Sequence, residues 1–233
     1  MPKRDYKQFC PTARALNVVG ERWTLLIVRD LLIAPRRYSY LRRSLTGMAS
    51  NLLAARLTEM EDAELVVKKR IEEPSPRDVY ALTDRGRALE PVLLELARFG
   101  FPLLGMPTAE QPMMAERVPL GLRAMMHEPE LPAGRLVIRF ALDEGDQLVT
   151  IAAQRPRGQR LLPTERVTVA AVEDHDQPES DVVVRGSMAG LLWIREGVID
   201  LDAANEQGLL SLEGSEDALT ALRFLYRLDA PAA

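Results

Sequence analysis

The sequence predicts a mainly α domain followed by an α+β domain. Two observations support this division of the 233 residues. Apolar residues at helical spacing dominate the first hundred residues, whereas alternating apolar residues, typical of strands, recur after residue 135. Between these regions, six of the sixteen prolines fall within residues 102–132, which is typical of a linker. We therefore predict a first domain over 1–105, a proline-rich linker with a short helix over 106–132, and a second domain over 133–233.

The order of elements in the first domain predicts a winged helix-turn-helix. Apolar residues at three- and four-residue steps indicate one long helix, which Cys10-Pro11-Thr12 begins and Pro35 ends. Two further helices begin at the caps Ser39 and Ser50, and a polar, proline-containing tip joins two β-forming stretches. The predicted elements are, in order, helices over 13–34, 39–45 and 50–63, strands over 65–71 and 79–82, and a helix from Thr83 or Asp84 to Arg98.

The second domain is predicted to be an α+β fold. Apolar and other residues alternate over 136–142, and Asp143-Glu144-Gly145-Asp146 marks a tight hairpin turn after this strand. Similar strand patterns recur further along, separated by amphipathic helices. The predicted elements are strands over 136–142, 147–152, 166–172, 182–185 and 209–213, and helices over 120–127, 188–196 and 216–227.

Charge is divided unequally along the chain. The net charge of −4 arises from 30 basic and 34 acidic residues. Through Gly105 there are 18 basic and 13 acidic residues, and after it there are 12 basic and 21 acidic residues. Because phosphate repels acidic surfaces, we expect the first domain to contact nucleic acid and the second to stand away from it.

Several function classes are excluded by composition. A single cysteine, Cys10, rules out an intramolecular disulfide, and with only His127 and His175 a structural zinc site is not expected. The chain lacks a signal-peptide pattern and any long apolar run, so we predict a cytoplasmic protein without a membrane partner. No nucleophile elbow or phosphate loop is present, and Glu173-Asp174-His175-Asp176 is interpreted as a solvated loop. We therefore predict no enzyme activity, no cofactor and no metal.

The helix predicted over 50–63 has the pattern of a recognition helix. With Leu53, Leu57 and Met60 facing inward, small and polar residues face outward near its start. Asparagine can pair with both edge atoms of adenine, and alanine or threonine can contact the thymine methyl group. The candidate base-reading residues are Ser50, Asn51, Ala54, Ala55 and Thr58.

Basic residues lie around this helix in the sequence. Affinity for DNA depends on phosphate contacts, which arginine and lysine make. For any single residue the alternative is a solvated charged surface, but nine of them bracket one candidate recognition helix. The candidate phosphate-binding residues are Arg36, Arg37, Arg42, Arg43, Arg56, Lys68, Lys69, Arg70 and Arg77.

Four consecutive segments of the first domain follow a known pattern in order and spacing. The segments are CPTARALNVVGERWTLLIVRDLL, PRRYSYLRRSL, MASNLLAARLTEMEDAELVVKKR and VYALTDRGRAL. Residues 10–99 thereby resemble the HxlR-type winged-helix transcriptional regulators of bacteria. One departure is Glu64, where that family usually has the glycine that ends the recognition helix; a residue with a side chain there takes a left-handed conformation or ends the helix differently.

The resemblance implies a homodimer that reads a pseudo-palindromic operator in double-stranded DNA. The dimer contact would involve the first and last helices of the domain. The sequence is compatible with such a contact, because it has more apolar residues than a small three-helix core requires. These additional residues are Tyr6, Phe9, Leu94 and Phe99. The resemblance also implies a candidate redox sensor, Cys10, because a thiol at a helix N-terminus can have a lowered pKa. The alternative for Cys10 is a small apolar residue packed against the dimer partner.

The second domain carries a further pattern. The segments GRLVIRFALDEGDQLVTI and DVVVRGSMAGLLWIREGVIDLDAANEQGLLSLEGSEDALTALRFL make residues 134–227 similar to sterol-carrier-protein-like domains. In that family the sheet and helices enclose an apolar tunnel, so the similarity implies a hydrophobic small-molecule effector. At the same spacing, however, apolar residues also form an ordinary core. The candidate pocket residues are Met188, Leu191, Leu192, Trp193 and Ile194.

The leading hypothesis is a homodimeric, repressor-like transcriptional regulator whose second domain senses a hydrophobic effector. The alternative is a hydrophobic-ligand carrier or storage protein with a vestigial DNA-binding domain. An acyl-handling enzyme would require a nucleophile and a base that the sequence does not show.

Overall fold

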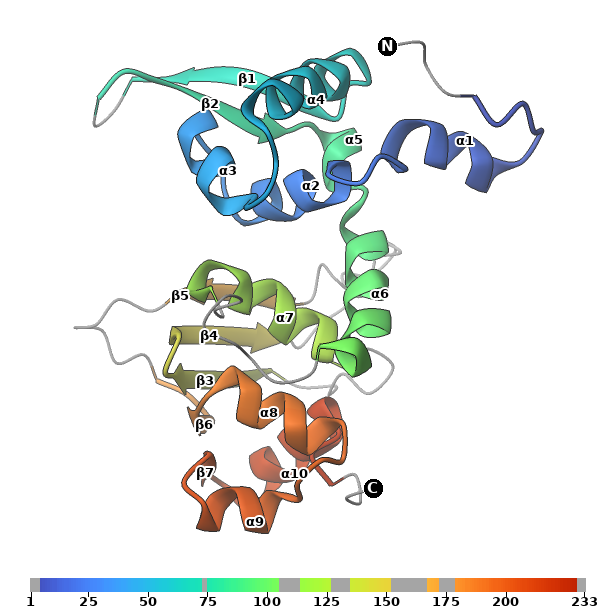
Figure 1. The fold of residues 1–233 in the computed structure, drawn as a ribbon. Coiled ribbons are helices and arrows are strands. Elements are labelled where there is room, and N and C mark those ends of the chain that lie inside the picture. The colour runs from blue at the N-terminus through green and yellow to red at the C-terminus, as the bar shows by residue number, and fades with distance from the viewer. Residues whose placement is uncertain are drawn as a thin grey trace, which may run out of the picture. The chain divides into compact units, whose positions relative to one another are not determined.

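The computed structural model of the chain describes residues 5–72, 75–104, 114–126, 135–151, 167–171 and 179–229. Figure 1 shows the helices and strands of these segments. The chain divides into two compact units, Met1–Leu93 and Leu94–Ala233, which we call unit 1 and unit 2. The division falls within one helix, α6 (Glu90–Gly100).

Unit 1 has the helix, helix and hairpin order of a winged helix-turn-helix. One further pair of backbone hydrogen bonds, between Arg36 and Tyr80, adds the segment before α3 to the edge of the hairpin. The strands of the hairpin are antiparallel, with Val66 opposite Leu82. The elements are α1 (Pro11–Val19), α2 (Thr24–Ile33), α3 (Tyr38–Ser44), α4 (Ser50–Asp62), β1 (Val66–Ile71), β2 (Arg77–Leu82) and α5 (Asp84–Arg87).

Two helices that the sequence predicts as continuous are each broken in the structure. The predicted helix over 13–34 is wrong as a single element, because α1 ends at Val19, with Gly20 as its C-cap, and α2 begins at Thr24. Glycine is a poor helix former, yet the apolar spacing continues across the break and hides it. The predicted helix ending at Arg98 likewise divides into α5 and α6. Pro91 lies in the first turn of α6, where a missing N–H group costs no helical hydrogen bond.

Three predicted helix caps can be compared with the structure. Thr83 is confirmed as a cap, since its hydroxyl accepts a hydrogen bond from the Gly86 N–H at 3.1 Å. Ser39 and Ser50 are wrong as caps, because the N-cap residues are Arg37 for α3 and Ala49 for α4. Both serines lie inside the first helical turn.

The end of α4 shows how the chain accommodates Glu64. This residue has a φ of 57°, so it adopts the left-handed conformation that glycine usually provides. The Leu65 N–H donates to the Met60 carbonyl at 2.9 Å, and the Glu64 N–H donates to the Glu61 carbonyl at 2.9 Å. These two bonds form a Schellman motif, which ends the helix without glycine. The hairpin therefore starts from an ordinary helix end.

The core of unit 1 lies where the helices meet the base of the hairpin. Leu53, Leu57 and Met60 of α4 are buried, which confirms the predicted inner face of that helix. They pack in one cluster with Ile27 of α2 and Leu41 of α3, among others. The residues on the outer face of α4 consequently do not pack in this core.

Unit 2 is an α+β fold built on a five-stranded sheet. The strand order is β5-β4-β3-β6-β7, in which β3 and β6 are parallel and the other neighbours are antiparallel. The elements are η1 (Phe101–Leu103), η2 (Ala115–Arg117), α7 (Val118–Met125), β3 (Leu136–Leu142), β4 (Gly145–Ile151), β5 (Val167–Ala171), β6 (Val182–Gly186), α8 (Met188–Arg195), α9 (Leu201–Glu206), β7 (Leu210–Gly214) and α10 (Glu216–Tyr226).

The predicted strands and helices of unit 2 are present within about two residues, and one helix was missed. The missed element is α9, which has six residues. Asp200 caps it by accepting a hydrogen bond from the Ala203 N–H at 2.7 Å. Asp200 was a signal for this helix start, since aspartate is a preferred N-cap residue.

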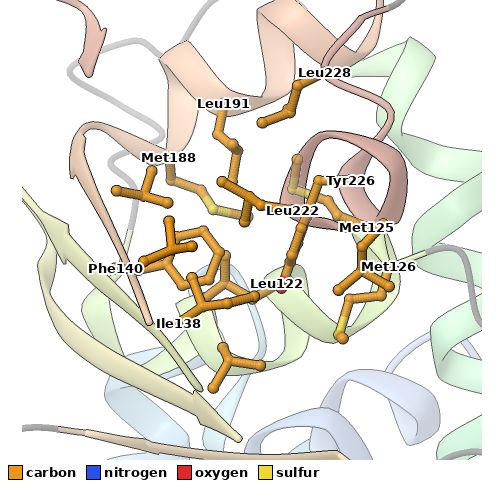
Figure 2. Packing of buried hydrophobic residues seen from close by; sticks show 14 of the residues in the cluster. Leu122, Met125, Met126, Ile138, Phe140, Met188, Leu191, Leu222, Tyr226 and Leu228 are labelled. Carbon is orange, nitrogen blue, oxygen red and sulfur yellow. The ribbon is translucent and has the colours of Figure 1, made fainter. Parts of the chain in front are cut away.

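The apolar core of unit 2 lies between the sheet and its helices. Figure 2 shows Ile138 and Phe140 of β3 facing Leu122 of α7, with Leu222 and Tyr226 of α10 beside them. Phe140 and Tyr226 make an edge contact, with ring centroids 5.3 Å apart. The interior is continuous and almost entirely apolar.

Two further findings concern only the described residues. None of their helices is long and apolar enough to cross a membrane. They contain no group of three cysteine, histidine or acidic side chains that could hold a metal ion. His127, His175 and the segment Glu173-Asp174-His175-Asp176 lie outside the described residues.

Candidate nucleic-acid interface

The relative position of α3 and α4 is fixed by polar contacts as well as by the core. The Tyr38 hydroxyl donates to the Ser50 carbonyl at 2.7 Å, which joins the first turn of α3 to the start of α4. At the C-terminal end of α3, the Ser44 hydroxyl donates to the buried carboxylate of Asp30 at 2.5 Å. Arg29 also binds this carboxylate, with both contacts at 2.9 Å. The helix-turn-helix is therefore tied to α2 and held as one piece.

The outer face of α4 is exposed and carries short polar side chains. All five candidate base-reading residues are exposed: Ser50, Asn51, Ala54, Ala55 and Thr58. The Thr58 hydroxyl donates to the Ala54 carbonyl at 3.2 Å, so its methyl group can face outward. This arrangement meets the steric requirement for entering a major groove.

Leu52 is a surface residue that sequence reasoning missed. Its side chain is 39% exposed, near the start of α4 and next to Asn51. A leucine without a place in the core is unusual on the face that carries the base-reading candidates. The signal was available, because Leu52 does not fit the inward spacing of Leu53, Leu57 and Met60.

Basic side chains lie on α3 and in the segment before it. Arg42 and Arg43 are exposed on α3, and Arg37 is exposed at its N-terminal end. The Arg36 guanidinium lies 4.1 Å from the ring centroid of Tyr40, and Arg43 lies 5.7 Å from the same centroid. Stacking on an aromatic face holds a guanidinium in place while leaving its outer edge for other contacts.

The hairpin, or wing, carries basic residues that are paired with acidic ones at its surface. Asp78 lies 3.0 Å from Lys68 and 3.6 Å from Arg70, and Arg70 also contacts Glu72 at 3.1 Å. The hydrogen bond from Lys68 holds the pKa of Asp78 below its usual value, and Asp78 raises the pKa of Lys68. Lys69 is exposed, and Arg77 donates to the Ser75 carbonyl at 3.1 Å. Exposed ion pairs of this kind can exchange with phosphate.

Arg56 differs from the other eight candidate phosphate-binding residues. Its side chain is only 12% exposed, and it forms ion pairs with Glu21, at 3.2 Å, and with Glu59. Both terminal nitrogens are thus engaged within unit 1. Arg56 thus connects α4 to the turn before α2, and its role in phosphate binding stays a prediction.

Cys10 occupies the N-cap position of α1 and is partly exposed. The backbone N–H groups of Ala13 and Thr12 lower the pKa of its thiol, although no side-chain cap hydrogen bond is formed. The positive end of the helix dipole acts in the same direction. The described residues thus contain one thiol with enhanced thiolate character.

A stripe of exposed apolar residues runs along α6 into η1. Its members are spaced at four, three and four residues, as on a coiled-coil seam: Val92, Leu96, Phe99 and Leu103. Phe99 is 74% exposed. Tyr6 and Phe9 are also exposed, as expected for additional apolar surface, whereas Leu94 is buried in the core of unit 2. The expectation for Leu94 was therefore wrong.

The five candidate pocket residues of unit 2 lie on α8. Met188, Leu191, Leu192 and Ile194 are buried members of the apolar core, and Trp193 is partly exposed. Figure 2 places Met188 and Leu191 near Leu222 and Phe140. Their positions are those of core residues.

Comparison with known proteins gives a family for the region that contains this site. The HxlR-like helix-turn-helix family model matches residues 18–106. The HTH-type transcriptional regulator YvaP of Bacillus subtilis is 34% identical over 96 residues, which cover 41% of this chain and 89% of the relative. The regulator YodB of the same organism is 32% identical over 88 residues, covering 37% of this chain and 79% of the relative.

A solved structure of YodB from B. subtilis, in its reduced form, is 28% identical, with a TM-score of 0.37. It covers 42% of this chain and 97% of that chain. Through the region matched by its relatives, this chain belongs to the HxlR-like helix-turn-helix family and is a transcriptional regulator with a helix-turn-helix DNA-binding domain.

Proposed function

We propose that the protein is a repressor-like homodimer that binds a pseudo-palindromic DNA operator through α4 of each subunit. The observation that carries this proposal is the exposed outer face of α4, bordered in the same unit by basic residues of α3 and of the wing. A helix of this kind reads base edges, and the basic residues beside it hold the DNA backbone. The hydrogen bond between Tyr38 and Ser50 holds α3 in a fixed position relative to the start of α4.

Direct base reading is assigned to the start of α4. Asn51 is the residue suited to adenine, while Ala54, Ala55 and Thr58 are suited to thymine methyl groups. Leu52 adds apolar surface beside Asn51. The set proposed for base contacts is Ser50, Asn51, Leu52, Ala54, Ala55 and Thr58.

Phosphate binding is assigned to the candidate basic residues other than Arg56, whose guanidinium is held by Glu21 and Glu59. On the wing, phosphate oxygens would replace Asp78 as the partner of Lys68 and Arg70, at little cost because those ion pairs are at the surface. The set proposed for phosphate contacts is Arg36, Arg37, Arg42, Arg43, Lys68, Lys69, Arg70 and Arg77.

Homodimer formation is assigned to the stripe on α6. Large apolar side chains at seam spacing are costly to leave in water, and a second copy of the same helix offers a matching seam. The exposed Tyr6 and Phe9 lie in the segment leading to α1, which is part of the same proposed interface. Two subunits would present two copies of α4 to DNA.

The operator should show this symmetry. Selection from a random pool of duplexes is expected to return an inverted repeat with half-sites about one helical turn apart, roughly 34 to 36 Å. The double variant Leu96→Glu, Phe99→Glu is expected to be monomeric by light scattering and to lose most of its operator affinity. Exposed Phe224 of α10 provides the control, because Phe224→Glu should leave mass and affinity unchanged. A variant that stays dimeric would contradict the role of the stripe.

Unit 2 is proposed to bind a hydrophobic effector that alters operator affinity, consistent with the similarity of its sequence to sterol-carrier-protein-like domains. An effector acts this way only if it binds the DNA-competent and incompetent states unequally. The alternative, a carrier or storage protein with a vestigial DNA-binding domain, predicts no salt-dependent operator binding. Measuring operator affinity at several salt concentrations distinguishes the two.

Cys10 is proposed to react with oxidants or electrophiles. Since the helix start lowers the pKa of this thiol, its reaction with iodoacetamide should reach half of its maximal rate at a lower pH than that of a free cysteine. The rate is read by mass spectrometry of the native protein, with the urea-unfolded protein as the control. Identical pH profiles for the folded and unfolded protein would contradict the proposal.

A further inference from the structure

Three buried side-chain polar atoms among the described residues of unit 2 have no hydrogen-bond partner. They are the hydroxyl of Tyr226, the Oε1 atom of Gln147 and one terminal nitrogen of Arg195. Tyr226 is fully buried, and Gln147 is 4% exposed. Most buried polar groups in native proteins are paired, because an unpaired group loses its hydration without compensation. Such atoms mark a place where another molecule would complete the pairing.

Tyr226 and Gln147 are both neighbours of Phe140. The Phe140 ring contacts the Tyr226 ring, and Phe140 on β3 lies opposite Gln147 on β4. Opposite residues of an antiparallel pair point to the same face of the sheet, with their side chains in reach of each other. Figure 2 shows Tyr226 extending from α10 into the core, between Phe140 and Met125. The unpaired atoms of Tyr226 and Gln147 therefore belong to one region of the interior.

The surroundings of these atoms are apolar and adaptable. Three methionines, Met125, Met126 and Met188, are buried in the same cluster. Methionine side chains are flexible and repack readily around different shapes. The cluster consists of hydrophobic residues, so a charged guest enclosed among them would lose its hydration.

We propose that this region binds a neutral, largely apolar alcohol whose hydroxyl group accepts a hydrogen bond from Tyr226 and donates one to Gln147. An alcohol suits the pair because it both donates and accepts, whereas the Oε1 atom of Gln147 only accepts. The inference rests on the proposed effector role of unit 2 and adds the chemical class of the ligand and the residues that hold its polar group.

The choice between an alcohol and an anion can be tested directly. The guanidinium of Arg195, which lies 5.0 Å from the Phe101 ring centroid and 3.8 Å from Glu196, also has an unpaired nitrogen. A carboxylate would bind there in preference. The probes are therefore 1-decanol, its methyl ether, which cannot donate, and decanoate, each titrated calorimetrically into the full-length protein.

The wild type is expected to bind 1-decanol at one site per chain and to bind the methyl ether more weakly. Tyr226→Phe should weaken decanol binding about three- to tenfold, the value of one hydrogen bond, and Gln147→Leu should do the same. Tyr6→Phe is the matched control, since Tyr6 is exposed in unit 1. The absence of saturable decanol binding, an unchanged affinity of Tyr226→Phe, or tighter binding of decanoate would overturn the proposal.

Stability without ligand gives a second readout. Because Tyr226→Phe removes an unpaired buried hydroxyl and keeps the ring, it should raise the melting temperature of the ligand-free protein by about 2 to 6 °C. A fall would mean that the hydroxyl is paired within the protein, which contradicts the proposal. Operator binding is measured on the same samples, so that a failure of the regulator assignment is seen separately from a failure of the alcohol site.

Discussion

Replacing Arg42 and Arg43 together by alanine is expected to weaken binding to every DNA sequence by a similar factor. Both residues are exposed on α3, beside the helix that is proposed to enter the groove. If each neutralises one phosphate, the slope of log K against log salt becomes about 1.8 less negative. The same relation gives a loss of about thirtyfold in affinity at 0.15 M salt. Fluorescence anisotropy with operator and random duplexes at several salt concentrations measures both quantities.

A matched pair of arginines in unit 2 provides the control. Arg185 and Arg223 are also exposed, so their double alanine variant removes the same net charge from a surface without a proposed DNA contact. This control should keep the salt slope of the wild type. An unchanged slope for the Arg42 and Arg43 variant, or an equal change in the control, would refute the assignment of α3 to the DNA backbone.

Replacing Gly86 by alanine is expected to destabilise unit 1 by about 3 kcal/mol or more, above the usual range for overpacking. Gly86 is buried in α5, and a Cβ atom there would lie 2.1 Å from the Leu65 carbonyl oxygen. That oxygen accepts the Thr83 N–H at 3.1 Å, so it cannot move without breaking the junction between the wing and α5. The added Cβ atom therefore clashes with the backbone of Leu65, which cannot shift as a side chain could.

Gly47 offers a control in which an added side chain strains the backbone without a steric clash. It has a φ of 87° in the turn between α3 and α4, but an added Cβ atom would meet nothing within 4 Å. Gly47→Ala should therefore cost only conformational strain, on the order of 1 kcal/mol. Urea unfolding followed by Trp23 fluorescence, with Trp193→Phe in every variant, reports on unit 1 alone. Equal losses for the two glycines would contradict the close approach at Gly86.

The sequence was sufficient for the type and order of most elements, because these depend on local patterns. The inner face of α4 followed from the spacing of Leu53, Leu57 and Met60, and the wing followed from two β-forming stretches around a proline-containing tip. The helix breaks after Val19 and before Glu90 were not predicted, since the apolar spacing runs on across both. Periodicity shows which residues share a face but not where the backbone turns.

The candidate site was predictable as a surface but not residue by residue. Exposure of the five base-reading candidates follows from the same spacing that buries the inner face of α4. The ion pair of Arg56 with Glu21 joins residues that are 35 positions apart, which no local pattern shows. Leu94 and Leu96 are equally apolar, and only the packing of unit 2 decides that Leu94 is buried and Leu96 exposed.

The parallel pairing of β3 with β6 also affects how the protein is made. The contacts that hold unit 1 together lie within Met1–Leu93, so this unit can fold once the ribosome has released that part of the chain. In unit 2, Ile138 can pair with Val182 only after β6 has been synthesised. Strand β6 in turn pairs with β7, which ends at Gly214. Pairing between distant segments is slow. We expect a folded unit 1 to exist on the nascent chain before the sheet of unit 2 is complete, so newly made chains could reach DNA before they could bind the proposed effector.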